Sequence, residues 1–360
     1  MANLTNKFLD LAFEQAKINL GSTKQNPSVG CVVEKDGSVI STGHTSKGGR
    51  PHAEFNALIN GKNFKNTNLY ISLEPCSHFG KTPPCVKLIL KKKVKKVFFP
   101  SIDPNPITSG KSFSILKKSG VKVKSNLNVK RFKEFYESYI NKFNKKKLLI
   151  DAKIAISKDF FTKNLRSKWI TNSHSRKIGN FLRSEYDILL TTSKTINTDN
   201  PLLNCRINGL SNKSPDLFIL DRFLKINKKS NIINKKMNRK IYIVTIKEDK
   251  KKINFLRSKK VKVILLKSFD KKKDFIKLLD IISKKGYSRI FVESGVVFLN
   301  FLNKNKFLDN LFIFQSCLKL KKKGSNKLDK NLIRQISHKN KINVNLNGNI
   351  LYKGKLSYYV

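Results

Sequence analysis

Two cysteines, a histidine and a glutamate near the start of the chain have the types and spacing of a catalytic metal site. His52 and Glu54 lie in a His-Ala-Glu triplet, and Cys76 and Cys85 follow later. Two thiolates and one imidazole can hold zinc, and a catalytic zinc ion keeps a fourth position open for water. Zinc lowers the pKa of that water to about 7. We expect His52, Cys76 and Cys85 to bind Zn²⁺ and Glu54 to be catalytic, moving protons without touching the metal.

The spacing of the two cysteines narrows this prediction. Zinc-dependent nucleobase deaminases use one histidine and two cysteines as ligands and a glutamate as proton shuttle, usually with a short Pro-Cys-x-x-Cys motif. Here a longer insert, Ser-His-Phe-Gly-Lys-Thr-Pro-Pro, separates Cys76 from Cys85. The segment resembles the deaminase half of the bifunctional riboflavin-biosynthesis deaminase/reductase. The resemblance implies hydrolytic deamination of a diaminopyrimidinone ribosyl phosphate.

Further polar residues match this family at positions that the resemblance assigns to substrate binding. An Asn-Pro pair precedes the first predicted strand, a histidine lies in Gly-His-x-x-x-Gly, and Asp-Pro-Asn-Pro matches a loop over the active site. Each motif alone is compatible with ordinary turn chemistry. The match weakens at Ser112, where the family has a glycine. The implied substrate-binding residues are Asn26, His44, His78, Lys81, Asp103 and Asn105.

The resemblance continues into the reductase half of the same family. Ser-Lys-Trp-Ile-Thr and Thr-x-x-x-Asp-Asn-Pro-x-Leu-x-x-Arg both match its motifs. The resemblance implies reduction of the ribosyl group to a ribityl chain, with NADPH as the hydride carrier, and Lys153 and Asp199 as catalytic residues. The implied NADPH-binding residues are Trp169, Thr195, Asp199 and Gly295, and the implied substrate-binding residues are Ser167, Arg183, Leu203, Arg206 and Glu293.

Three departures from the family pattern fall in the reductase half. Phe160 and Ser294 replace glycines, and residues 315–318 replace an Ala-Pro segment. Loss of a glycine matters where the backbone needs a positive φ or lies close to a ligand. We expect Phe160 either to crowd the nicotinamide pocket or to lie on an extended backbone. A deaminase whose second domain has lost reduction is therefore an alternative function.

The elements that must position these residues alternate between strand and helix patterns. A Pro-Pro pair suits the first turn of a helix, and it would place Cys85 near the positive end, which favours the thiolate. A Lys-rich linker is expected at 141–147. The other predicted elements are an N-terminal helix with Leu4, Phe8, Leu11, Ala12 and Ile18 on its apolar face, helices at 52–59 and 111–119, and strands at 29–34, 39–41, 69–73, 94–99, 121–124, 148–157, 217–220 and 289–291.

These elements predict two α/β domains. Residues 1–145 are expected to form a cytidine-deaminase-like three-layer α/β/α domain, which is the zinc-dependent pyrimidine deaminase. Residues 146–360 are expected to form the NADPH-dependent reductase, for which the resemblance implies a dihydrofolate-reductase-like α/β fold. The sequence lacks Gly-x-Gly-x-x-Gly, the fingerprint of a Rossmann dinucleotide site. The Lys/Asn-rich region from about residue 320 gives no prediction.

The net charge of +51 would ordinarily indicate a nucleic-acid partner. Lys outnumbers Arg 64 to 11, however, whereas phosphate and base recognition favour the guanidinium. The excess charge is also spread over both halves. We therefore expect a small-molecule pyrimidine ribosyl phosphate as partner and no specific nucleic acid. A zinc-dependent RNA-editing or RNA-binding protein is the alternative from another class.

The cysteine content and hydropathy set the expected location. Five cysteines, an odd number, do not indicate a disulfide framework, and Cys31, Cys205 and Cys317 are expected to be small buried side chains. No stretch resembles a secretory signal or a membrane span. We expect a cytoplasmic enzyme with no membrane partner. The sequence is compatible with a homo-oligomer, and it leaves the oligomeric state open.

Overall fold

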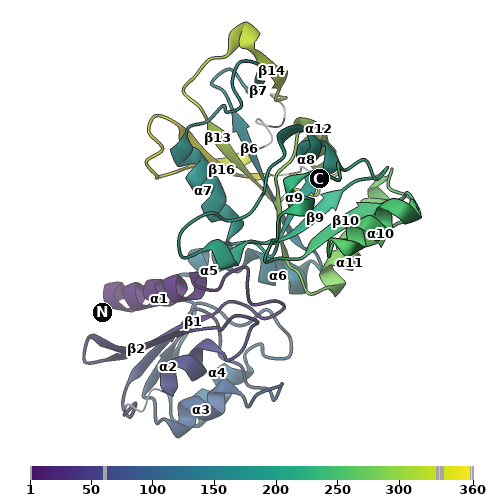
Figure 1. Cartoon of the computed structure of the whole chain (residues 1–360). Coiled ribbons are helices and arrows are strands. Elements are labelled where there is room, and N and C mark those ends of the chain that lie inside the picture. Colours follow the sequence, from purple (N-terminus) through teal and green to yellow (C-terminus); the bar gives the residue numbers. More distant parts are fainter. Residues whose placement is uncertain (1, 60–62, 330–331, 333–335, 357, 359–360) are drawn as a thin grey trace. The chain divides into compact units, whose positions relative to one another are not determined.

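The computed structural model describes residues 2–59, 63–329, 332, 336–356 and 358. The chain folds into two compact units, Met1–Leu148 and Leu149–Val360 (Figure 1). The division lies close to the domain boundary expected after residue 145. In the part of the chain that the structure describes, no helix combines the length and hydropathy needed to cross a bilayer.

The first unit is built around a mixed sheet with the strand order β2-β1-β3-β4-β5. The pairs β1–β2 and β1–β3 are antiparallel, whereas β3–β4 and β4–β5 are parallel. The strands are β1 (Gly30–Lys35), β2 (Ser38–His44), β3 (Asn68–Ile71), β4 (Lys96–Phe98) and β5 (Lys122–Lys124). The helices are α1 (Ala2–Lys17), α2 (Ala53–Leu58), α3 (Cys85–Lys91), α4 (Lys111–Lys118), α5 (Val129–Phe135) and α6 (Glu137–Asn144).

Strand alternation gives this sheet two apolar faces. Val32, Tyr70 and Phe98 are register partners on adjacent strands and pack together with residues of α1. The neighbours of these residues along each strand point to the opposite face. There they join a core that includes residues of α2, α3 and α4. Helices on both faces of one sheet make three layers, so the predicted α/β/α architecture is confirmed.

Two details of the first unit differ from the prediction. On α1, Phe8 and Ala12 are buried as expected, but Leu4 is exposed because the buried stripe also runs through Leu9, Phe13 and Ala16. Ile18 is exposed because it lies beyond the end of the helix at Lys17. The expected linker begins too early, since α6 continues to Asn144. Lysine is a good helix former, and Tyr139 of α6 is anchored in the core, so the Lys-rich composition does not end the helix.

The second unit contains a larger sheet with the order β11-β10-β9-β8-β12-β6-β13-β16-β15. The pairing is parallel from β11 to β13, and β16 and β15 add antiparallel strands at one edge. Its strands are β6 (Leu149–Ile156), β8 (Ile188–Thr192), β9 (Asp216–Leu220), β10 (Ile241–Thr245), β11 (Lys262–Leu265), β12 (Arg289–Val292), β13 (Asn310–Gln315), β15 (Ile336–Ile342) and β16 (Ile350–Leu356).

Helices connect the parallel strands of this unit, which confirms the predicted α/β class. The helices are α7 (Ser173–Arg183), α8 (Ser193–Asp199), α9 (Asn231–Asn234), α10 (Lys250–Ser258), α11 (Lys272–Lys284) and α12 (Val296–Lys304). A separate small sheet pairs β7 (Phe161–Asn164) with β14 (Gly324–Lys327). The region after residue 320, whose structure was not predicted, therefore supplies β14, β15 and β16.

The cysteines follow the expectation except at one position. All five are free thiols, and Cys31 and Cys205 are buried. Cys317 is exposed, so the prediction that it is buried is wrong. It lies beyond the end of β13, where the chain has left the sheet and no longer has a layer to cover it.

The expectation that Phe160 lies on an extended backbone is wrong. It lies in the turn between β6 and β7, where its N–H donates to the carbonyl of Ser157 at 3.0 Å. Its φ is 70°, in the left-handed region that a glycine adopts without a Cβ penalty. The backbone at Phe160 is therefore not extended. A phenylalanine in place of glycine at this position carries a conformational cost.

Replacing Phe160 with glycine tests this cost. For L-residues the left-handed conformation costs roughly 1–2 kcal/mol. Phe160→Ala removes the ring and keeps the Cβ, so it is the matched control. We expect Phe160→Gly to be about 1 kcal/mol more stable than Phe160→Ala, measured as the free energy of unfolding in urea. An alanine variant that is equally stable would contradict the presence of strain.

Candidate functional site

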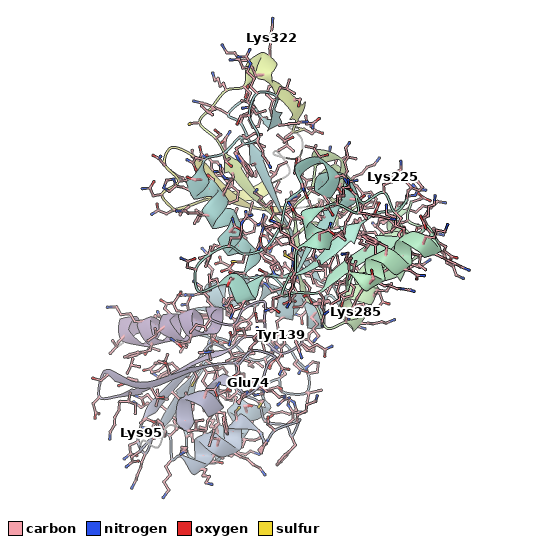
Figure 2. All side chains as sticks on the ribbon, viewed as in Figure 1. Glu74, Lys95, Tyr139, Lys225, Lys285 and Lys322 are labelled. Atoms are coloured by element: carbon pink, nitrogen blue, oxygen red, sulfur yellow. The ribbon has the colours of Figure 1, made fainter. Side chains whose placement is uncertain are left out.

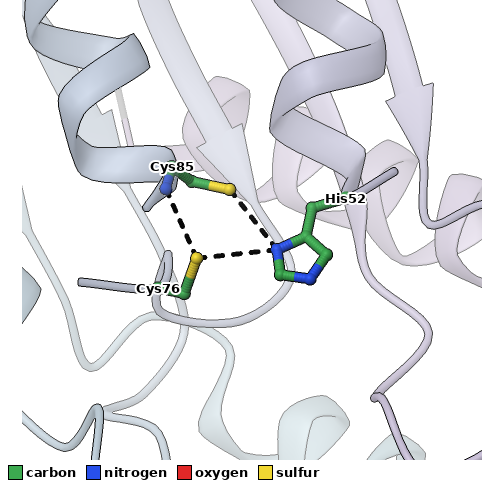
Figure 3. A group of neighbouring side chains, drawn as sticks. All are labelled: His52, Cys76 and Cys85. Atoms are coloured by element: carbon green, nitrogen blue, oxygen red, sulfur yellow. Dashed lines mark hydrogen bonds between the residues drawn. The ribbon is translucent and has the colours of Figure 1, made fainter. Parts of the chain in front are cut away.

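Three chain segments meet at the carboxyl end of β3, the central strand of the first sheet, and bring together the predicted metal ligands. His52 directly precedes α2, Cys76 follows β3, and Cys85 is the first residue of α3. Their donor atoms all lie within 4.8 Å of one another, and both sulfur atoms are 3.5 Å from His52 Nδ1 (Figure 3). Tetrahedral zinc with ordinary bond lengths separates nitrogen and sulfur ligands by roughly 3.6 Å. The donor set therefore fits zinc.

A glycine on the neighbouring strand fixes the position of α2. A Cβ at Gly43 would lie 2.3 Å from the carbonyl oxygen of Ala53 and 2.5 Å from the nitrogen of Ala57. Only glycine permits so close an approach of helix to sheet. Because α2 begins directly after His52, this contact also fixes the ligand and holds Glu54 in the interior.

Glu54 has the properties of a proton shuttle. Its side chain is buried, with the residue only 3% exposed. Burial and, to a smaller extent, the charge of Cys76 together raise the pKa of Glu54 to about 7. A carboxyl group whose pKa lies near the working pH is suited both to accept and to donate a proton.

The start of α3 stabilises the thiolate of Cys76. The backbone N–H of Cys85 donates to Cys76 Sγ at 3.3 Å, and hydrogen bonding from Cys85 lowers the pKa of Cys76 to about 4. Pro84 is the N-cap residue and precedes the helix, so the proline pair lies just outside the first turn where it was expected. Cys85 still lies at the positive end of the helix, as predicted.

A buried carboxylate that sequence reasoning missed ties the first cysteine to residues 103–113, a loop that runs into the first turn of α4 and is called the 103–113 loop below. Glu74 is 3% exposed and directly precedes the Pro-Cys motif, and Figure 2 shows its place in the unit. It accepts hydrogen bonds from the backbone N–H groups of Asp103 at 2.9 Å, Gly110 at 3.0 Å and Phe113 at 3.3 Å. The only sequence signal was an acidic residue at the end of an apolar strand.

The same loop carries two expected substrate residues and one departure from the family. Asp103 is buried, which raises its pKa to about 6, and it accepts the N–H of Asn105 at 2.8 Å. The hydroxyl of Ser112 donates to the carbonyl of Pro75. The serine that replaces a family glycine thus adds a second tie between this loop and the segment leading to Cys76.

The remaining expected substrate residues of the first unit lie on three different segments. Asn26 Nδ2 donates to the carbonyl of Gly49 at 2.7 Å, and Gly49 lies close to His52 in the sequence. His44 ends β2, and His78 Nδ1 lies 3.3 Å from Thr108 Oγ1, which joins the cysteine insert to the 103–113 loop. Lys81 is exposed within that insert.

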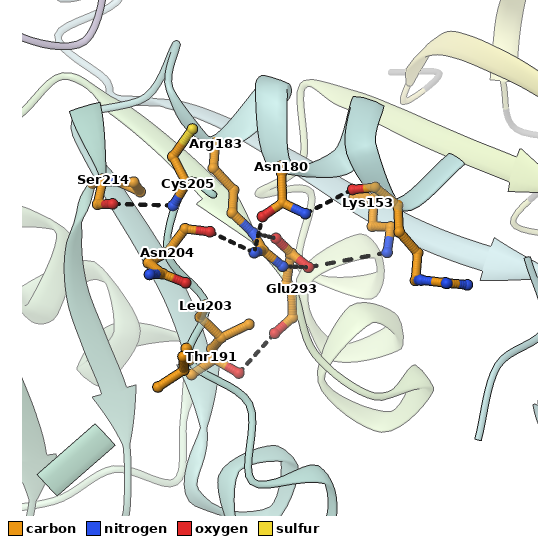
Figure 4. A network of polar contacts seen from close by, with 12 residues as sticks. Lys153, Asn180, Arg183, Thr191, Leu203, Asn204, Cys205, Ser214 and Glu293 are labelled. Carbon is orange, nitrogen blue, oxygen red and sulfur yellow. Dashed lines mark hydrogen bonds and ion pairs between the residues drawn. The ribbon is translucent and has the colours of Figure 1, made fainter. Parts of the chain in front are cut away.

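The second unit contains a buried ion pair among the expected reductase residues. Arg183 Nε lies 2.5 Å from Glu293 Oε1, and Arg183 Nη2 lies 3.0 Å from Glu293 Oε2, so the pair is bidentate (Figure 4). Lys153 Nζ is 4.0 Å from Glu293 Oε2. Burial alone would raise the pKa of Glu293, but the charge of Arg183 outweighs it and the pKa is lowered. The carboxylate stays ionised between two cations.

Arg239, which sequence reasoning also missed, holds the chain near this pair. Its Nη1 donates to the carbonyl of Leu203 at 2.7 Å, and its Nη2 donates to that of Leu202 at 2.5 Å. Burial and, to a smaller extent, the charge of Arg183 together lower the pKa of Arg239 to about 10. Glu293 also interacts with Arg206. The cations around Glu293 therefore outnumber the carboxylates, which suits a phosphate-bearing substrate.

The expected cofactor residues lie on the segments around this cluster. Trp169 is 51% exposed, and the guanidinium of Arg176 lies 4.6 Å from its ring centroid. The N–H of Trp169 donates to Ser167 Oγ at 3.3 Å. Thr195 lies in the first turn of α8, and Asp199 is its exposed last residue.

The turn before α12 fits an anionic cofactor. Gly295 is the N-cap residue of α12, and no atom lies within 4 Å of where its Cβ would be. Helix N-termini favour phosphate groups. Ser294 has no positive φ and Gly295 has a φ of −68°, so the serine that replaces a glycine here costs no backbone strain.

Comparison with known proteins accounts for both units. Residues 2–101 match the cytidine and deoxycytidylate deaminase zinc-binding region, and residues 150–320 match the RibD C-terminal domain. The riboflavin biosynthesis protein RibD of Aquifex aeolicus is 34% identical over 310 residues, which cover 85% of each of the two sequences. The chain belongs to the RibD family.

RibD structures confirm the predicted fold and family. Acinetobacter baumannii RibD superposes with a TM-score of 0.83 at 25% identity, covering 99% of this chain and 100% of the other. The Thermotoga maritima protein described as diaminohydroxyphosphoribosylaminopyrimidine deaminase/5-amino-6-(5-phosphoribosylamino)uracil reductase has a TM-score of 0.81 at 27% identity and 99% coverage of both. This RibD-family chain is therefore an enzyme with both a deaminase domain and a reductase domain.

Removing one donor tests the metal centre. Wild-type protein should retain about one zinc ion per chain after dialysis, and Cys85→Ala should retain almost none, because two remaining ligands hold zinc poorly. Metal analysis by mass spectrometry measures both. Cys317→Ala is the control, since it removes an exposed thiol outside the donor set. Stoichiometric zinc in Cys85→Ala would rule out the assignment.

Proposed function

We propose that this chain catalyses two consecutive steps of riboflavin biosynthesis. The first is hydrolytic deamination of a diaminopyrimidinone ribosyl phosphate, and the second is reduction of 5-amino-6-(5-phosphoribosylamino)uracil by NADPH. The observation that carries the proposal is the convergence of His52, Cys76 and Cys85 beside buried Glu54. The match of residues 150–320 to the RibD C-terminal domain favours this function over RNA editing, which needs no reductase.

In the deaminase site, the side chains divide ligation from proton transfer. We assign zinc ligation to His52, Cys76 and Cys85, and zinc bound there would supply an acidified water molecule. Glu54 would accept a proton from the attacking water as the water oxygen adds to the amino-bearing carbon. It would then donate that proton to the amino group, so that the C–N bond breaks and ammonia leaves. Its pKa of about 7 suits both transfers. The substrate would be held by Asn26, His44, His78, Lys81, Asp103 and Asn105.

In the reductase site, the protein orients two partners and neutralises phosphate charge. NADPH would supply the hydride to C1′ of the ribosyl group. We assign Lys153 and Asp199 as catalytic residues, and Arg183 and Arg206 as cations for the substrate phosphate. The bidentate pair with Arg183 gives Glu293 a share in orienting that guanidinium. NADPH would contact Trp169, Thr195, Asp199 and Gly295, and the substrate would also contact Ser167, Leu203 and Glu293.

We also propose a cytoplasmic location. All five cysteines are free thiols, and two of them are proposed zinc ligands. Thiols stay reduced in the cytosol, whereas oxidising compartments convert them to disulfides.

Glu54→Gln tests the proton shuttle. The amide has the same shape and cannot carry protons, so ammonia release should fall by roughly 10²–10⁴-fold while zinc content stays unchanged. Glu34→Gln is the control because Glu34 is also buried, at 5% exposure, and lies on β1 away from the donor set. Deamination within tenfold of wild type in Glu54→Gln would assign the proton transfer to another group.

Asp199→Ala tests whether the two activities are separable. It should abolish NADPH oxidation and leave ammonia release intact, because Asp199 lies in the unit that does not contain the zinc donors. Glu54→Gln should have the opposite effect when the aminouracil intermediate is supplied directly. Absorbance at the NADPH band and an ammonia assay follow the two steps. Wild-type protein that releases ammonia but oxidises no NADPH would reduce the function to deamination alone.

A further inference from the structure

Arg50 brings a positive charge to the insert between the two cysteine ligands. It lies just before His52 in the sequence, and its Nη1 donates to Thr82 Oγ1 at 2.6 Å. Thr82 belongs to the segment between Cys76 and Cys85. No carboxylate among the described residues forms an ion pair with Arg50. The guanidinium is therefore held in place by a neutral hydroxyl and keeps its full charge.

A second nitrogen donor faces the same small volume. A Cβ placed on Gly80 would lie 3.3 Å from Arg50 Nη2 and 3.9 Å from His78 Nε2. The other ring nitrogen of His78 is directed to Thr108, so Nε2 is the atom turned toward Gly80. Glycine leaves open the space between a guanidinium and an imidazole, which a larger side chain would fill.

This volume lies within electrostatic range of the metal ligands. Only Pro51 separates Arg50 from His52, and both His78 and Gly80 lie between Cys76 and Cys85. Lys81 follows Gly80 directly in the insert. A group bound between Arg50 and His78 would thus be close to the zinc donors and would meet cationic side chains from both segments.

We propose that Arg50 binds the 5′-phosphate of the deaminase substrate, with His78 Nε2 as its partner. The proposal rests on the proposed function, since it takes its ligand from that substrate. A phosphate monoester carries nearly two negative charges and accepts several hydrogen bonds, which the fixed fork of a guanidinium matches. The bond to Thr82 orients this fork before the substrate arrives. Arg50 is then a specificity residue that distinguishes the ribosyl phosphate from the free nucleoside.

The experiment compares ammonia release from the ribosyl phosphate and from its dephosphorylated nucleoside. A hydrogen bond to a charged group is worth about a 10- to 100-fold change in affinity. Arg50→Ala should raise KM for the phosphate by that factor and leave KM for the nucleoside and the zinc content unchanged. Arg50→Lys should lie between wild type and Arg50→Ala, because it keeps the charge and loses the fork.

Two control variants separate this role from simpler ones. Lys95→Ala removes a positive charge just before β4, at the end of the strands away from Cys76 (Figure 2), and should leave both KM values unchanged. Thr82→Val removes the bond that holds Arg50 and keeps its charge, so the phosphate preference should largely persist. If Arg50→Ala affects both substrates equally, or if Thr82→Val reproduces its effect, Arg50 is a latch for the insert and the proposal is wrong.

A measurement of binding affinity in a variant that does not turn over tests the phosphate site independently of the proposed reaction. Calorimetry on zinc-loaded Glu54→Gln protein should show the same 10- to 100-fold loss of phosphate-compound affinity when Arg50→Ala is added. If wild-type protein releases no ammonia but this loss is found, the deaminase assignment fails and the phosphate site stands. Equal affinity of the two proteins for the phosphate compound would overturn the site itself.

Discussion

The three donor side chains can converge only because two helices begin close to the carboxyl end of the central strand β3. His52 precedes α2 and Cys85 opens α3, while Cys76 follows β3 in the loop between them. The close approach of α2 at Gly43 sets the depth of this arrangement. The clustering of the donor atoms, the burial of Glu54 and the position of the Cys85 N–H against Cys76 Sγ all follow from that packing. A shift of either helix by a side-chain radius would separate the donor atoms.

The two sites use the same residue type in opposite electrostatic settings. Glu54 is buried near thiolates, and burial together with Cys76 raises its pKa to about 7. Glu293 is also buried, but the bidentate contact with Arg183 more than offsets desolvation and its pKa is lowered. Neighbouring charge thus decides which carboxyl group can exchange protons near neutral pH and which one stays an anion beside cations. The same side-chain type is therefore suited to carry protons in one unit and to act as a fixed counter-ion in the other.

The sequence predicted the cluster of His52, Cys76 and Cys85 and both fold classes, because their evidence is local spacing and strand–helix alternation. It missed Glu74 and Arg239, whose partners are backbone groups brought close only by tertiary folding. The linker was predicted to begin at residue 141, inside α6, because a lysine-rich composition indicates exposed surface and does not indicate where a helix ends. The conformation of Phe160 could not be derived, since a turn that demands positive φ is recognised by the glycine that is missing here. The roles assigned to individual site residues stay predictions.

The carboxylate of Glu74 has a consequence for the dynamics of the deaminase unit. It accepts backbone N–H groups from three positions of the 103–113 loop, and it directly precedes the Pro-Cys motif. Lifting that loop would leave a buried anion without its donors, which costs far more than breaking ordinary surface contacts. Loop and metal segment therefore form one cooperative element that opens as a whole. Opening of the site would therefore have to involve the cysteine insert, whose residues 79–83 are exposed, rather than this loop alone.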